Sequence, residues 1–155
     1  MNMSTIFRIE NINEIGPYNA EVEIFSRKHI RDDIKRPSPW SSNEDCKLSE
    51  LFKSGEENYK KFSFGFNSLE DLNSWFNKGD MYLLARHNFY LTKYEIDENY
   101  VIYGKKQLVF LKTEVKSKMT RRLEPSVLGF ICYVSERLFT KFQEKIKEIR
   151  FNLTF

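Results

Sequence analysis

The chain has 155 residues, of which 41% are hydrophobic and 15% aromatic, and its formal net charge is +3. This length suits a single domain, and so much apolar surface excludes a disordered chain. The sequence contains no run of 18 apolar residues and no apolar signal segment, so we expect no membrane-spanning helix and a location in the cytoplasm.

Motifs for metal and phosphate binding are missing from the sequence. The cysteines, Cys46 and Cys132, and the histidines, His29 and His87, do not have the spacing of a zinc site. Neither a glycine-rich phosphate loop nor a nucleophile elbow occurs. We therefore expect no metal site and no cofactor.

A strand is predicted near the start of the chain, over residues 5–10. Side-chain type alternates there, which places Ile6, Arg8 and Glu10 on one face of the strand. We expect Arg8 to stand on a polar face. A turn is predicted at residues 16–19, because glycine permits unusual backbone angles and proline fixes φ.

A polar loop excursion is predicted at about residues 27–55, inside a single domain that spans 1–155. A connection of this length is unusual in a compact domain unless it has a function. Residues 47–53 within it predict a short helix with an apolar inner face. Trp40 and Arg36 are candidate partner-binding residues, because a large ring in a loop either binds a partner or packs on the domain's own core.

A strand followed by a capped helix is predicted in the middle of the chain. Aromatic residues alternate with small ones over 61–66. Either Asn67 or Ser68 can cap the following helix, since each has an acidic residue three positions later. We interpret residues 77–80 as the end of this helix.

The remaining chain predicts a series of strands and a long helix. The strands are expected at residues 81–85, 89–96, 99–103 and 107–115. An amphipathic helix is expected from Ser135 to Phe151, with a start as early as Ser126 as the alternative. The predicted fold class is therefore α+β, with a mainly antiparallel twisted sheet, a central short helix and a C-terminal amphipathic helix.

Seven basic residues cluster between positions 105 and 122, with Glu114 as the opposing acid. A basic surface of this kind is able to bind a partner or to neutralise phosphates, which would make nucleic-acid affinity depend on salt. The alternative is a solvated edge strand whose lysines prevent edge-to-edge pairing. The seven are Lys105, Lys106, Lys112, Lys116, Lys118, Arg121 and Arg122.

Three segments resemble small proteins encoded by bacteriophages and prophages. They are FRIEN followed by GPYN, then FSFGFNSLEDLNSWF, and finally YEIDENYVIYGKKQLVF. The resemblance implies a phage accessory protein, which would work in the host cytoplasm. Because the sequence contains no recognised catalytic set, we expect it to act without catalysis. Such a protein would bind a host or defence-system component, either a protein or a nucleotide-like ligand.

A more distant similarity is to the ADP-ribosyltransferase-like fold, which has a basic residue on its first strand, a serine before a helix and a later acid. It implies an NAD-dependent enzyme in which Arg8 contacts NAD, Ser68 lies beside the nicotinamide and Gln107 occupies the place of the acid. We add Tyr18 to these candidate ligand-binding residues. Because a neutral amide cannot supply negative charge to a transition state, Gln107 favours binding without transfer.

We therefore interpret the chain as a non-catalytic binding protein of phage type. Its candidate contact surfaces are the 27–55 excursion and the basic segment between 105 and 122. The alternatives are an NAD-dependent ADP-ribosyltransferase-like enzyme and a nucleic-acid-binding protein.

Overall fold

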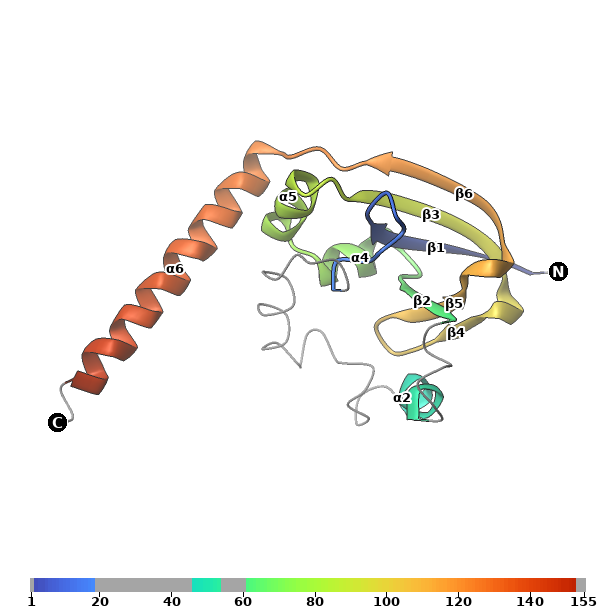
Figure 1. Cartoon of the computed structure of the whole chain (residues 1–155), viewed down its shortest axis with the longest axis horizontal. Coiled ribbons are helices and arrows are strands. Elements are labelled where there is room, and N and C mark those ends of the chain that lie inside the picture. The colour runs from blue at the N-terminus through green and yellow to red at the C-terminus, as the bar shows by residue number, and fades with distance from the viewer. Residues whose placement is uncertain (1, 19–45, 54–60, 153–155) are drawn as a thin grey trace.

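The structure, a computed structural model, describes residues 2–18, 46–53 and 61–152 (Figure 1). Within these ranges the strands form two three-stranded antiparallel sheets accompanied by helices, which confirms the predicted α+β class. Most of the predicted 27–55 excursion, including Arg36 and Trp40, lies outside the described residues.

The first sheet, sheet A, has the strand order β1-β3-β6. Its strands are β1 (Met3–Glu10), β3 (Tyr90–Asp97) and β6 (Val115–Arg122). The register places Ile6 opposite Tyr94 and Tyr94 opposite Lys118. The central strand β3 thus pairs on both sides, whereas β6 lies at an edge of sheet A.

The second sheet, sheet B, has the order β2-β5-β4. Its strands are β2 (Phe62–Gly65), β5 (Leu108–Leu111) and β4 (Val101–Tyr103). The predicted strand at 107–115 therefore ends early, and a 3-10 turn, Lys112–Glu114, leads from β5 into β6. A second 3-10 turn, Glu98–Tyr100, precedes β4.

A backbone bridge joins the two sheets. Phe7 of β1 and Phe66, just after β2, exchange two hydrogen bonds of 2.8 Å. Gly65 permits this close approach, because a methyl group at that position would overlap the Cγ2 of Ile6 and lie 3.2 Å from the carbonyl oxygen of Phe7. A glycine is thus required where β1 crosses β2.

Two short helices, α4 (Leu69–Trp75) and α5 (Lys78–Arg86), follow β2. Helix α4 begins at its Ser68 cap as predicted, but the predicted strand at 81–85 is wrong because those residues belong to α5. The side chain of Asn77 accepts a 2.9 Å hydrogen bond from the Asp80 amide, and the Asp80 carboxylate accepts one of 3.1 Å from the Asn77 amide. This reciprocal capping starts a new helix directly after α4.

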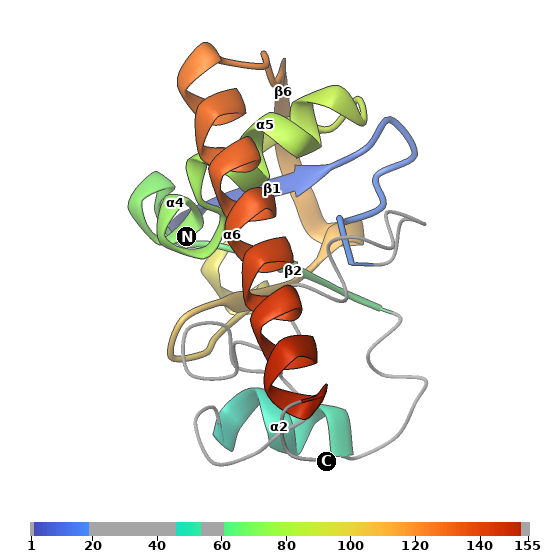
Figure 2. The same ribbon diagram turned by 90° about the vertical axis from the view of Figure 1, so that its left-hand side faces the viewer.

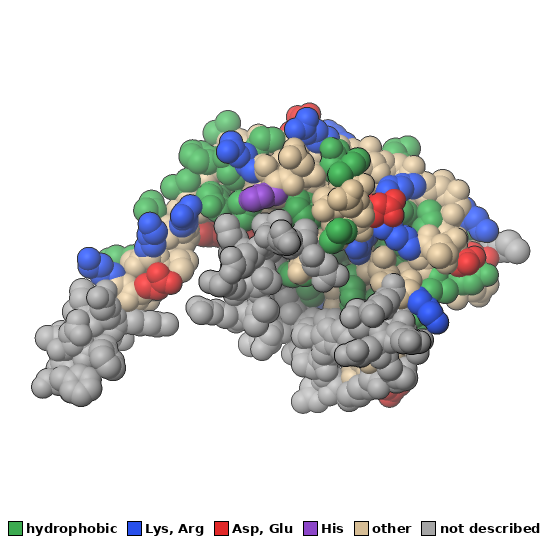
Figure 3. Space-filling model, in the orientation of Figure 1, with side chains coloured by type: hydrophobic (Ala, Val, Ile, Leu, Met, Phe, Trp, Pro, Cys, Tyr) green, Lys and Arg blue, Asp and Glu red, His purple; other side chains and the backbone are tan. Residues whose placement is uncertain are grey.

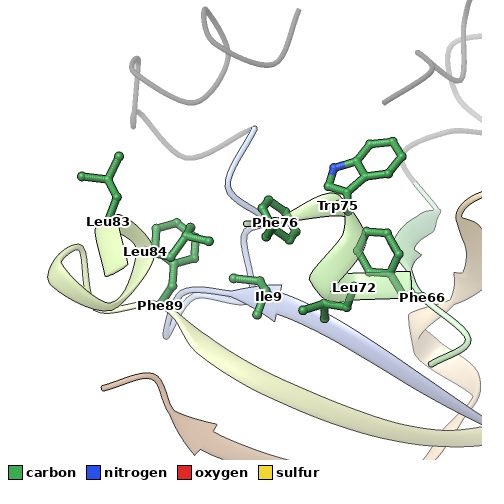
Figure 4. Close-up of a cluster of buried hydrophobic side chains, with 8 residues drawn as sticks. All are labelled: Ile9, Phe66, Leu72, Trp75, Phe76, Leu83, Leu84 and Phe89. Atoms are coloured by element: carbon green, nitrogen blue, oxygen red, sulfur yellow. The ribbon is translucent and has the colours of Figure 1, made fainter. Parts of the chain in front are cut away.

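Three clusters of buried hydrophobic residues hold these elements together. The first joins α4 and α5 to sheet A (Figure 4) and contains Ile9, Phe66, Leu72, Trp75, Phe76, Leu83, Leu84 and Phe89. The second connects sheet A with sheet B and contains Ile6, Tyr94, Ile96, Val101, Leu108 and Phe110. The third packs α2 (Cys46–Lys53) against sheet B through Leu48, Phe52 and Val109, which confirms the predicted inner face of this helix.

The long helix α6 (Val127–Asn152) follows β6 and corresponds to the earlier of the two predicted starts. Its first turns lie against α5, and the rest projects away from the sheets (Figure 1). In Figure 2, α6 runs across the front of the molecule. Within the described ranges, no helix has the apolar length required to cross a membrane.

Candidate functional site

A buried carboxylate lies at the end of β1. Glu10 is only 1% exposed, and its Oε2 lies 2.9 Å from the Nε of Arg8. The hydroxyl of Tyr94 donates a hydrogen bond to the other carboxylate oxygen, and the Arg8 guanidinium also donates to the backbone carbonyl of Phe64. The predicted polar face of β1 is covered by sheet B: the Arg8 side chain is 12% exposed, and its charge is balanced by Glu10 instead of by solvent.

Two lysines and a second carboxylate complete this arrangement. The Nζ of Lys112 lies 3.5 Å from Glu10 and 2.7 Å from Glu14. The Nζ of Lys118 lies 3.3 Å from Glu10 and 2.5 Å from Glu14. We call Arg8, Glu10, Glu14, Tyr94, Lys112 and Lys118 the Glu10 cluster; it joins β1 and the following turn to the 3-10 turn after β5 and to β6.

The charges of the Glu10 cluster stabilise one another. Burial disfavours the charged form of Glu10, but the Tyr94 hydroxyl and the three cations outweigh this and lower its pKa. Hydrogen bonds from Lys112 and Lys118 lower the pKa of Glu14 to about 2. Burial and the Glu10 carboxylate together raise the pKa of Tyr94. Both carboxylates are consequently ionised at neutral pH and bound by cations, which makes them weak bases.

A second charged feature is the edge of sheet A. Strand β6 has four basic and no acidic side chains, and all eight of its residues except Val115 are exposed. We call Lys116, Lys118, Arg121 and Arg122 the basic edge. Lys118 also belongs to the Glu10 cluster, and an Arg122 Nη lies 3.4 Å from the side-chain oxygen of Asn88. In Figure 3, basic side chains are visible on the upper side of the molecule, beside hydrophobic and acidic ones.

The structure separates the seven basic residues predicted to form one cluster. Lys105 and Lys106 are exposed in the turn between β4 and β5. Lys112 is 23% exposed and points into the Glu10 cluster. The remaining four residues form the basic edge, and three of them, Lys116, Arg121 and Arg122, lie outside the Glu10 cluster, whereas Lys118 pairs with Glu10 and Glu14. The candidate partner-binding residues with outward-facing charge are therefore in two places, the β4–β5 turn and the edge of sheet A.

The predicted ligand-binding residues each make a contact that supports the fold. Arg8 binds Glu10. The hydroxyl of Tyr18 accepts a 2.6 Å hydrogen bond from the indole of Trp75. The Ser68 hydroxyl accepts a 3.0 Å hydrogen bond from the Asp71 amide at the start of α4. Gln107, just before β5, is 9% exposed, and its backbone carbonyl accepts a 2.9 Å hydrogen bond from the Gly104 amide.

Sequence reasoning missed the roles of Glu10, Glu14 and Tyr94. Opposite charges at positions 8 and 10 of one strand were a usable signal, because residues two apart share a face. Glu14 had no such signal, since its partners are about a hundred positions away. In the part of the chain that the structure describes, no group of three or more His, Cys, Asp or Glu residues is arranged to hold a metal ion.

The family of bacteriophage T4 Y00F proteins matches residues 1–125. The chain belongs to this family. The match covers both sheets, the Glu10 cluster and the basic edge, and it ends just before α6 begins at Val127. The resemblance to phage proteins is thus confirmed, whereas the similarity to ADP-ribosyltransferases finds no support in these comparisons. No curated protein and no solved structure matches the chain.

Proposed function

We propose that this member of the phage family acts without catalysis, by binding an acidic protein of the host cell or of its defence systems through the basic edge. The observation that carries the proposal is the position of β6, an exposed strand with four basic side chains at the edge of sheet A. The proposal requires neither NAD nor another cofactor.

An edge strand is able to bind a strand of a partner protein. Its outward backbone groups are able to hydrogen bond with an added strand, a recognised mode of protein association. Lysines on such an edge normally oppose this pairing, since bringing basic strands together is unfavourable. An acidic partner would neutralise the basic edge, so the same side chains that reject basic or neutral strands would select an acidic one.

Nucleic acid is the second candidate partner, because phosphates would also neutralise Lys116, Arg121 and Arg122. A phosphate backbone would use the basic side chains alone, however. A protein strand would also use the outward backbone groups of β6, the exposed edge strand of sheet A. We therefore favour a protein.

The test is capture from host-cell lysate with wild type and a charge-reversed edge. The edge variant combines Arg121→Glu with Arg122→Glu. The control combines Lys47→Glu with Lys61→Glu, which makes the same change in net charge at exposed positions beside sheet B. Urea unfolding of each protein would confirm that both variants fold.

We expect one stoichiometric protein to be captured by the wild type and the control and to be lost from the edge variant. Capture should survive nuclease treatment. Loss of the captured material on nuclease treatment would assign the basic edge to nucleic acid. A protein that binds the edge variant as well as the wild type would disprove the proposal.

A further inference from the structure

One face of helix α6 packs against helix α5 and the residue that caps it. The ring of Tyr133 lies 5.8 Å from that of Tyr82 in α5, and Glu136 accepts a 3.0 Å hydrogen bond from the Asn77 side chain. Gly129 lies so close to α5 that an added methyl group would come within 2.8 Å of a backbone carbonyl oxygen. These three residues define the inner face of α6.

The opposite face of α6 carries exposed hydrophobic residues. Each residue turns a helix by about 100°, so Ile131, two positions before Tyr133, points away from α5. Residues within about 80° of that direction form a set that we call the outer stripe. Their exposed fractions are Leu128 51%, Ile131 53%, Leu138 63%, Phe139 64% and Phe142 62%. Figure 3 shows hydrophobic, basic and acidic side chains side by side on the visible part of α6.

Four members of the outer stripe, together with Ser135, have the spacing of a helix-pairing seam. Positions 128, 131, 135, 138 and 142 are separated alternately by three and four residues, the repeat by which two helices wrap around one another. Ser135 is the one polar residue in this series, and its small side chain permits close approach. A helix that served only to cover α5 would have no use for a second apolar face with this repeat.

We propose that the outer stripe binds the same stripe of a second copy of this chain. The charges beside the stripe permit this pairing: between Val127 and Ile146, α6 has three basic and two acidic residues, so two copies meet with both signs present. The basic edge, in contrast, has basic residues alone and would repel its own copy. A two-fold arrangement uses one surface twice and is the commonest form of self-association.

The available area predicts a weak dimer. At roughly 100 Å² for each of the five side chains, two helices would bury about 1,000 Å² together, just below the ~1,200 Å² at which stable interfaces begin. Among the described elements, α5 makes the main contact with α6, and it lies on the side of that helix away from the outer stripe. We therefore expect association in the micromolar range or above rather than an obligate dimer.

The test is the molar mass of the full chain, measured by sedimentation equilibrium from low to several hundred micromolar protein. Phe142→Glu places a charge in the stripe, and Gln143→Glu adds the same charge at an exposed neighbour outside it. Both residues are exposed, so folding should survive, and urea unfolding would confirm this.

We expect wild type and Gln143→Glu to pass from monomer to dimer with concentration, and Phe142→Glu to lose at least tenfold in association constant. The edge variant Arg121→Glu with Arg122→Glu should dimerise like the wild type, which separates this proposal from the proposed function. A wild type that stays monomeric throughout would overturn the inference, as would dimers of Phe142→Glu as strong as those of the wild type. A monomeric wild type whose stripe binds a different protein would overturn the second-copy assignment.

Discussion

Replacing Glu10 by Gln would test whether the Glu10 cluster stabilises the fold. The change keeps the shape of the side chain and an acceptor for the Tyr94 hydroxyl, but it removes the charge that faces Arg8 at 2.9 Å. Removing one partner of a buried ion pair costs about 3–5 kcal/mol, because the other charge is left uncompensated. Lys112 and Lys118 would still have Glu14. We therefore expect a loss of about 2–3 kcal/mol in the free energy of unfolding.

Urea unfolding followed by the fluorescence of Trp75 would measure this loss. Trp75 is 6% exposed in the first core cluster, and a Trp40→Phe background would make it the only tryptophan. Small proteins lose about 1–3 kcal/mol of stability per molar urea, so the midpoint should fall by roughly 1 M or more. Glu95→Gln is the control, because that carboxylate pairs with Lys93 in solvent and its removal should leave the midpoint unchanged. Equal midpoints for wild type and Glu10→Gln would refute the reasoning.

Three further outcomes are expected. Urea midpoints should fall as the pH drops from 4.5 towards 2, because Glu14, with its pKa lowered to about 2, stays charged in the folded state while the unfolded chain takes up a proton. Glu14→Gln should reduce the fall of the midpoint over this pH range. An identical pH profile for the variant would contradict the assignment. Gly65→Ala should lower the free energy of unfolding by about 1–3 kcal/mol, since the added methyl group overlaps Ile6. An unchanged melting temperature would show that the two sheets separate easily. Ser68→Ala should cost about 1 kcal/mol through loss of the cap on α4, whereas Ser68→Asp should retain most of the stability.

Local sequence signals predicted some elements well. Ser68 and the acidic residue three positions later mark a helix start by local chemistry alone, and α4 begins there. The same kind of signal misled at 77–80, because Asn77 and Asp80 both follow one helix and cap the next. A sequence of residues able to end a helix is equally able to start one, and only the three-dimensional packing of α5 on α6 and sheet A decides between them.

The Glu10 cluster shows why the site was harder to predict than the fold. Alternation correctly placed Arg8 and Glu10 on one face of β1, but it gave no sign that sheet B would cover that face. Lys112 and Lys118 reach it only because β6 returns to the far side of β3. Charge neutralisation over such sequence distances depends on topology, which a local pattern does not contain.

The order β1-β3-β6 also has a consequence for folding. The first strand, Met3–Glu10, pairs within sheet A only with Tyr90–Asp97, which is made much later in the chain. Its earlier contact, the bridge from Phe7 to Phe66, already closes a loop of almost sixty residues. Contacts so distant in sequence cost loop-closure entropy before they gain stability, so we expect this chain to fold in milliseconds or more slowly. During synthesis, the first strand of sheet A would leave the ribosome long before its neighbour exists, and nascent chains would expose Ile6 and Ile9 for that interval.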